Sequence, residues 1–98
     1  EIIGKTGPLV SDSIRCGIAV WGPDIDYPMH RHDAEEIYVV LAGSAMFTLG
    51  DNPAVSRAED DVVFVSSGLQ HGFFTTTEAL AVLYLWQGGD LRQISSFL

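Results

Sequence analysis

Apolar residues occur along this chain in short runs, and turn-forming residues separate them. Runs of this length that are rich in β-branched and aromatic residues are typical of β-strands. The separating segments contain glycine, proline, asparagine and aspartate, which favour turns. Six strands are predicted, at Ile14–Trp21, Glu36–Leu41, Ala45–Leu49, Val62–Val65, Gly72–Thr76 and Leu80–Trp86. Many short strands at regular spacing predict an all-β sandwich or barrel.

The predicted strands belong to one domain. Ninety-eight residues allow a single modest core, and neither a linker nor a repeat divides the chain. The tail from Asp90 to Leu98 is the segment in which we expect a short helix, with Asp90 as its N-cap. The chain opens at Glu1 rather than at methionine, which leaves open whether an N-terminal region precedes it. We therefore expect one all-β domain over residues 1–98.

All three histidines of the chain fall into one group. His30 and His32 have the same parity in an extended segment, so their side chains point to one face. Glu36 shares that parity, and a turn or strand at residues 33–35 would return its carboxylate to the same face. His71 would close the group from a distant strand. Imidazole and carboxylate groups bind Fe²⁺, Zn²⁺, Mn²⁺ or Ni²⁺, so we predict one divalent metal inside a small jelly-roll barrel. The alternative is a solvated loop pair and an unrelated turn histidine.

Net charge and cysteine content restrict the partners. The formal charge of −8 argues against nucleic acid and anionic membranes, and it suits a cationic or zwitterionic small ligand. No apolar run approaches the roughly 20 residues of a membrane span, and no signal peptide is evident. The single Cys16 allows no internal disulfide and is expected to lie buried in a strand. We expect a cytoplasmic protein that is able to form a homodimer.

Two motifs in the chain resemble those of the cupin superfamily. They read His30-x-His32-x3-Glu36-x6-Gly43 and Gly68-x2-His71. The resemblance implies a small cupin domain with a jelly-roll β-barrel, and it implies that the histidines and the glutamate bind the metal. The sequence departs from the general cupin pattern at turn and loop positions, which are Asp24, Asp60, Ser66 and Thr75.

A longer pattern resembles the cupin-type dimethylsulfoniopropionate (DMSP) lyases, which cleave DMSP to dimethyl sulfide and acrylate. The pattern reads Tyr27-Pro28-x-His30-x-His32-x3-Glu36-x-Tyr38, then Ser66-x-Gly68-x2-His71, then Leu83-Tyr84-Leu85-Trp86-x-Gly88-Gly89-Asp90-Leu91. Its more specific parts are the two tyrosines that flank the ligands and the ending after the last strand. These lyases usually carry a helical region before the barrel, whereas only residues 1–13 precede the first predicted strand here.

The chemistry of such a β-elimination assigns roles to three aromatic residues. Removal of a weakly acidic proton next to a carboxylate requires a base, and Tyr38 would point inward beside Glu36. Aromatic faces bind cations for roughly 0.5–2 kcal/mol each, so Tyr27 and Trp86 are candidates to hold the sulfonium group. Each also has a structural interpretation: Tyr38 and Trp86 as core residues, and Tyr27 as a turn residue before Pro28.

Three classes of function follow from these patterns. The first is a metal-dependent lyase that acts on DMSP or a similar zwitterion. The second is a metal-binding cupin with other chemistry, such as a dioxygenase or an isomerase. The third is a non-catalytic sensor of a small molecule. Neither the metal nor the substrate can be chosen from the residues alone.

Overall fold

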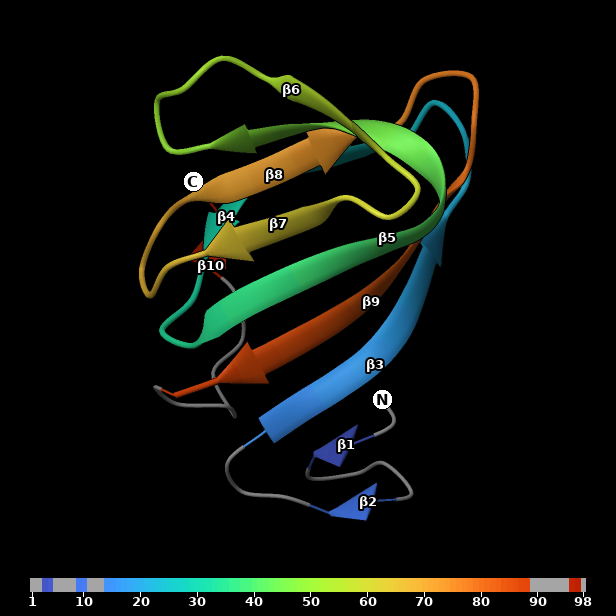
Figure 1. The fold of residues 1–98 in the computed structure, drawn as a ribbon. Helices are drawn as coiled ribbons and strands as arrows, with labels where there is room; N and C mark the ends of the chain where they lie inside the picture. The colour runs from blue at the N-terminus through green and yellow to red at the C-terminus, as the bar shows by residue number, and fades with distance from the viewer. Residues whose placement is uncertain (1–2, 5–8, 11–13, 89–95, 98) are drawn as a thin grey trace.

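The computed structural model describes residues 3–4, 9–10, 14–88 and 96–97, and in these ranges the regular elements are strands. The long strands curl into one half-barrel (Figure 1). The ten strands among the described residues are β1 (Ile3–Gly4), β2 (Leu9–Val10), β3 (Ile14–Trp21), β4 (Asp26–Arg31), β5 (Glu35–Leu49), β6 (Val55–Ala58), β7 (Val62–Val65), β8 (His71–Phe74), β9 (Leu80–Gln87) and β10 (Ser96–Phe97). The predicted all-β fold class is therefore confirmed.

Strand β5 belongs to both walls of the half-barrel. Its first part, residues 35–43, pairs with β7 and β9, and β9 in turn pairs with β3. Its second part, residues 44–49, pairs with β6 and β8, and β8 in turn pairs with β4. All of these pairings are antiparallel. Figure 1 shows the bend of β5 at the edge where the two walls meet.

The prediction of two separate strands on either side of Ala42-Gly43 was wrong, because these residues bend one strand instead of ending it. The pairing of β5 with β9 shifts register between Val40 and Ala42. Gly43 then has a φ of +78°, and a Cβ at this position would lie 1.7 Å from the Ala79 carbonyl oxygen. Only glycine allows that close approach together with a left-handed backbone. The bend carries the strand from one wall to the other.

Several other strand assignments need correction. Strands β4 and β6 were not among the six predicted, because β4 contains charged residues and a proline and β6 is short and half polar. The predicted tail helix falls mostly on residues 90–95, which lie outside the described residues. Residues 96–97 form a strand that pairs with β4, so the helix does not extend over them. Across the described ranges, no helix is long and apolar enough to cross a membrane.

The concave face of the half-barrel holds the core. Alternate residues of each strand point inward, so Tyr38 and Val40 of β5 face Val63 of β7 and Val82 of β9. The remaining buried members of this cluster are Ala45, Phe47, Val65, Phe73 and Leu80. Cys16 in β3 is also buried, as predicted, but it lies outside this cluster, on the convex side of its wall. The two walls therefore enclose a single apolar interior, and polar residues that point inward stand out against it.

The convex face of the wall formed by β3, β9, β5 and β7 is also apolar, and we call it the outer face. Two rows of paired residues cross all four strands: Ile18–Leu83–Val39–Val62 and Cys16–Leu85–Ile37–Phe64. The exposed fractions of Ile18, Val62 and Phe64 are 54%, 57% and 50%. A contiguous apolar surface of this kind marks an interaction site more often than a solvated surface.

Candidate metal centre

The four predicted metal ligands come together at one end of the half-barrel. His30 on β4 is paired directly with His71 on β8. His32 follows the end of β4, and Glu36 is the second residue of β5. The exposed fractions of all four residues are between 1% and 3%. The prediction that His30, His32 and Glu36 point to the same face is therefore confirmed.

Two local features fix the segments that carry the histidines. Strand β4 has an irregular register between Tyr27 and His30, and its backbone there packs against Gly72. A Cβ on Gly72 would lie 2.9 Å from both the Met29 nitrogen and the Tyr27 carbonyl oxygen, so a side chain would push the strands apart. The turn after β4 is held by a hydrogen bond from the Gly68 N–H to the His32 carbonyl, at 3.0 Å. These contacts set the separation of the two histidine segments.

Each imidazole is oriented by a backbone carbonyl two residues away. The Nδ1 atoms of His30, His32 and His71 lie 2.8, 2.9 and 3.0 Å from the carbonyl oxygens of Pro28, Ala34 and Leu69. A carbonyl can only accept, so Nδ1 carries the proton in all three rings, and the Nε2 lone pair is left to face the interior. Metal-binding histidines are usually oriented in this way: one ring nitrogen faces the metal, and the N–H of the other donates to a carbonyl.

The inward-facing atoms converge on one point. One ring nitrogen from each of the three histidines lies within 4.8 Å of the other two. The Glu36 Oε1 atom lies 3.0 Å from His32 Nε2 and 3.3 Å from His71 Nε2. Two ligands that are each about 2.0–2.2 Å from one metal are separated by distances of this order. The three histidines could therefore hold a divalent metal, and Glu36 lies beside two of them.

The protonation states support the same conclusion. If Nδ1 holds the proton in each ring, a neutral imidazole presents only a lone pair to the Glu36 carboxylate, and two facing lone pairs repel. A cation, either a proton or a metal ion, is needed between them. The buried His71 Nε2 has no hydrogen-bond partner in the described part of the chain. Burial lowers the pKa of His30, which favours the neutral form that binds a metal.

Trp86 orients the carboxylate. The indole Nε1–H of Trp86 on β9 donates to Glu36 Oε2 at 2.7 Å, so Oε1 is directed toward the histidines. The indole also stacks on the His32 ring, with centroids 4.0 Å apart and planes at 25°. The Arg15 guanidinium on β3 lies 5.3 Å from the centroid of the Trp86 ring. Neither this donor role nor Arg15 was predicted, because both depend on the pairing register of β3, β9 and β5.

Glu36 is ionised in this environment. Burial by itself would raise the pKa of the carboxyl, but the contacts with His32 and His71 in their protonated form and the hydrogen bond from Trp86 outweigh it and lower the pKa from 4.5 to about 2. A buried carboxylate with this pKa carries a full negative charge at neutral pH. It supplies one charged ligand to the site, and the three histidines supply neutral ones.

Tyr38 and Tyr27 lie next to the ligands. Tyr38 is 3% exposed, and its ring centroid is 6.1 Å from that of His71. Burial raises the pKa of Tyr38 well above 10, and the charge of Glu36 raises it further, so the phenol is protonated when no cation is bound. Tyr27 is partly buried, with its ring 4.5 Å from that of His30 and stacked on Trp21. The two residues predicted to hold the substrate cation, Tyr27 and Trp86, thus each contact a different histidine ring.

The architecture is shared with known cupins. One solved structure, an RmlC-like cupin family protein with a double-stranded β-helix fold from Methanocaldococcus jannaschii, superposes with a TM-score of 0.73 at 14% identity. The alignment covers 79% of this chain and 72% of that one. At this level of identity the match concerns the fold alone. The fold is that of a small cupin domain.

Sequence comparison identifies the family. The profile of the dimethylsulfoniopropionate lyase family matches residues 1–82, so the chain belongs to this family. It is 38% identical over 87 residues to the dimethylsulfoniopropionate lyase DddQ of Ruegeria pomeroyi, which corresponds to 89% of this chain and 43% of that protein. The resemblance expected from the tyrosine-flanked motif is therefore confirmed.

Two crystal structures of DMSP lyases agree with this assignment. The structure of DddQ from Ruegeria pomeroyi has a TM-score of 0.92 at 36% identity, and the match covers 98% of this chain and 48% of DddQ. A chain from the crystal structures of the DMSP lyases RdDddP and RnDddQII has a TM-score of 0.92 at 30% identity, with coverage of 99% and 50%. The present chain thus spans about half the length of the relatives that it matches.

The pKa of Glu36 predicts how the stability of the metal-free protein depends on pH. The folded pKa of about 2 lies below the unfolded value of 4.5, so the contribution of Glu36 to stability is complete above pH 4.5 and is lost as the pH falls toward 2. Urea unfolding between pH 2 and 5 measures this loss. We expect Glu36→Gln to reduce the pH dependence in that window, whereas Glu35→Gln, the matched control, should retain it. Equal pH dependence in the two variants would contradict the assignment.

Proposed function

We propose that His30, His32, Glu36 and His71 bind one divalent transition metal, with Fe²⁺, Zn²⁺, Mn²⁺ and Ni²⁺ as the candidates. The observation that supports this most directly is the convergence of imidazole lone pairs on the buried carboxylate. Three neutral nitrogens and one carboxylate suit any of these ions, because their affinities differ mainly through geometry and availability. A metal bound here supplies positive charge that stabilises the substrate carboxylate and a nearby phenolate.

We further propose that the chain contributes the active site of a lyase that cleaves DMSP to dimethyl sulfide and acrylate by β-elimination. Membership of the DMSP lyase family supports this substrate over those of a dioxygenase, an isomerase or a sensor. The excess of negative charge on the chain also suits a substrate with a cationic sulfonium group.

In this proposal Tyr38 is the base. Its phenolate oxygen takes the proton from the carbon next to the substrate carboxylate. The electron pair of that C–H bond forms the new C=C bond, and the C–S bond breaks with its electrons left on sulfur as neutral dimethyl sulfide. The burial of Tyr38 excludes water from the base, and its position two residues after Glu36 keeps it beside the metal ligands.

Tyr27 and Trp86 are proposed to contact the substrate. Their rings pack on His30 and His32, respectively, so a sulfonium next to the centre would meet an aromatic face. We also propose that residues 1–98 form a single cupin domain and that the protein is cytoplasmic. The described residues support the first, because all of their strands belong to one connected sheet.

The outer face supports a proposal about assembly. We propose that a second copy of the chain covers it and forms a homodimer. Self-association of an apolar sheet face buries the same residues on both partners, which a two-fold interface requires. The exposed side chains Ile18, Val20, Val62 and Phe64 would lose their contact with water on association.

Metal binding is tested with His32→Ala. Loss of this ligand should weaken metal binding by more than the roughly 10–100-fold that follows loss of an outer-shell partner. Elemental analysis measures the bound metal, and thermal melting with and without a chelator measures its contribution to stability. Gln70→Ala, next to His71 but outside the site, is the control and should keep both. Unchanged metal content in His32→Ala would contradict the assignment.

The role of Tyr38 is tested with Tyr38→Phe, which keeps the ring and removes the oxygen. Loss of a general base typically lowers the rate about 10²–10⁴-fold. We expect a folded, metal-loaded variant that releases dimethyl sulfide at this reduced rate, measured by gas chromatography. Tyr84→Phe is the matched control, since Tyr84 is paired opposite Tyr38 but its hydroxyl lies over Gly17 of β3. A metal-loaded Tyr38→Phe protein with most of the wild-type rate would rule out this mechanism.

The homodimer is tested by light scattering coupled to size-exclusion chromatography. We expect the wild-type chain to have twice the monomer mass, and Phe64→Glu to have the monomer mass because it places a charge in the outer face. Phe74→Glu is the control, since Phe74 is similarly exposed (41%) but lies on β8 in the other wall. A monomeric wild-type chain, or equal masses for the two variants, would contradict the proposal.

A further inference from the structure

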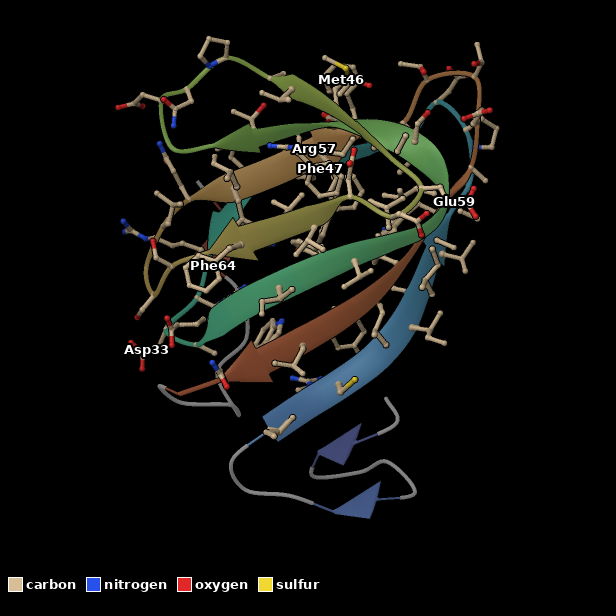
Figure 2. The ribbon with its side chains drawn as sticks, viewed as in Figure 1. Asp33, Met46, Phe47, Arg57, Glu59 and Phe64 are labelled. Carbon is tan, nitrogen blue, oxygen red and sulfur yellow. The ribbon has the colours of Figure 1, made fainter. Side chains whose placement is uncertain are left out.

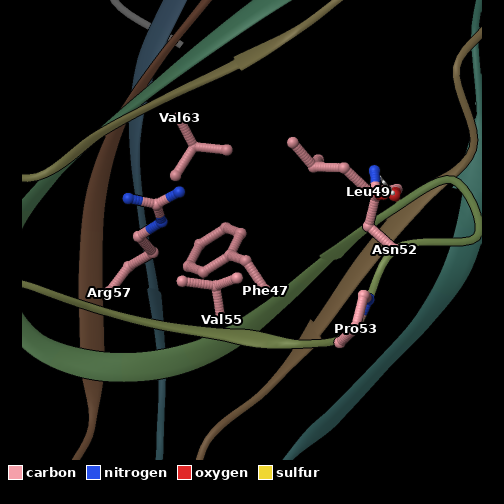
Figure 3. Close-up of a pocket in the computed structure, with 7 residues that line it drawn as sticks. All are labelled: Phe47, Leu49, Asn52, Pro53, Val55, Arg57 and Val63. Carbon is pink, nitrogen blue, oxygen red and sulfur yellow. Dashed lines mark hydrogen bonds between the residues drawn. The ribbon is translucent and has the colours of Figure 1, made fainter.

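A second cavity lies apart from the candidate metal ligands, between β6 and β7 (Figure 3). Its volume is about 210 Å³, below the roughly 300–1,000 Å³ of pockets that hold drug-sized ligands. It therefore suits a molecule of a few carbon atoms. The lining residues are Phe47, Leu49, Asn52, Pro53, Val55, Arg57 and Val63. Arg57 is the one residue of this set that carries a charge.

Arg57 points into the half-barrel because of its position on β6. It is paired with Ala45 of β5, and Val55 is paired with Phe47. Ala45 and Phe47 are buried in the core, so the alternation of β6 turns Val55 and Arg57 to the same inner side. The small side chain of Ala45 leaves room for the guanidinium. Figures 2 and 3 show Arg57 beside Phe47, and in Figure 3 its guanidinium extends toward Val63.

The guanidinium of Arg57 has no acceptor in the described part of the protein. The residue as a whole is half-buried, whereas its Nε atom is buried and makes no hydrogen bond. This is notable in a chain with thirteen acidic and five basic residues. A buried N–H without a partner lowers stability, so an inward-facing arginine that lacks one indicates an acceptor supplied from outside the chain.

We propose that this cavity binds a small carboxylate with a short apolar chain. The guanidinium would donate to the carboxylate oxygens, a pairing for which its planar fork is suited. The apolar chain would pack on Phe47, Val55 and Val63. An inorganic phosphate would satisfy the charge but leave the exposed side chain of Val55 in contact with water. The proposal rests on the cavity and on Arg57, and it does not depend on the proposed lyase activity.

The site is separate from the metal centre but in contact with it. None of its lining residues is a candidate metal ligand. Phe47 lines the cavity, and its ring lies 5.5 Å from Tyr38 and 4.9 Å from Phe73. Leu49 is paired with His71. A carboxylate could also bind directly to a metal, so the experiment must report where the probe binds.

The test is a titration of the metal-loaded protein with butyrate, followed by NMR of the labelled methyl groups of valine and leucine. We expect saturable shifts at Val55, Val63 and Leu49, and no comparable shifts with butyramide, which has the same size but no charge. Arg57→Gln should weaken butyrate binding about tenfold or more. Arg31→Gln removes an equal charge at an exposed position outside the cavity and should bind as the wild type does.

A second variant tests the same site in case Arg57→Gln does not fold. Val55→Glu places a carboxylate two residues from Arg57 on the same side of β6, where it can occupy the guanidinium and exclude butyrate. We expect this variant to melt at or above the wild-type temperature and to show no butyrate shifts in the cavity. Shifts confined to residues around the metal, equal binding of butyramide, or unchanged binding by a folded Arg57→Gln or Val55→Glu would each overturn the proposal.

Discussion

Strand β5 is the constraint on which the rest of the structure depends. Its fifteen residues pair with four other strands, two in each wall, so the two walls cannot move apart without breaking it. Glu36 and Tyr38 lie on its first part, and Phe47 and Leu49 on its second part. The metal centre and the Arg57 cavity are therefore positioned by the same backbone. The bend at Gly43 brings these two parts face to face.

A buried charge governs the chemistry of the interior. The Glu36 carboxylate is buried; the indole N–H of Trp86 donates to one of its oxygens, and the imidazoles of His32 and His71 lie beside the other. The backbone carbonyls that hold the three Nδ1–H groups leave those imidazoles without protons to donate inward. The arrangement is consequently incomplete without a cation, and the surrounding apolar core strengthens its attraction for one. Burial raises the pKa of Tyr38, and the same negative charge raises it further when no cation is present.

Much of the site could be predicted from the sequence because it depends on strand alternation. The parity of His30 and His32 required only an extended segment, and the turn between β4 and β5 returns Glu36 to the same buried side, as predicted. The course of β5 was not predictable in the same way, because Ala42-Gly43 is equally compatible with a turn and with a bend. Arg15 and Arg57 were missed for a different reason. Their positions depend on the register between strands, which the alternation of a single strand does not determine.

The same alternation has a consequence for how this chain can change during evolution. Residues 36–40 of β5 alternate between the metal centre and core on one side and the outer face on the other. Substitutions can therefore alter one surface and leave the other intact. Insertion or deletion of one residue in this stretch would exchange the two surfaces, so that Ile37 and Val39 would enter the interior and the carboxylate ligand would leave it. Outside the positions that bind or bend, β5 therefore tolerates a change of residue type more readily than a change of length.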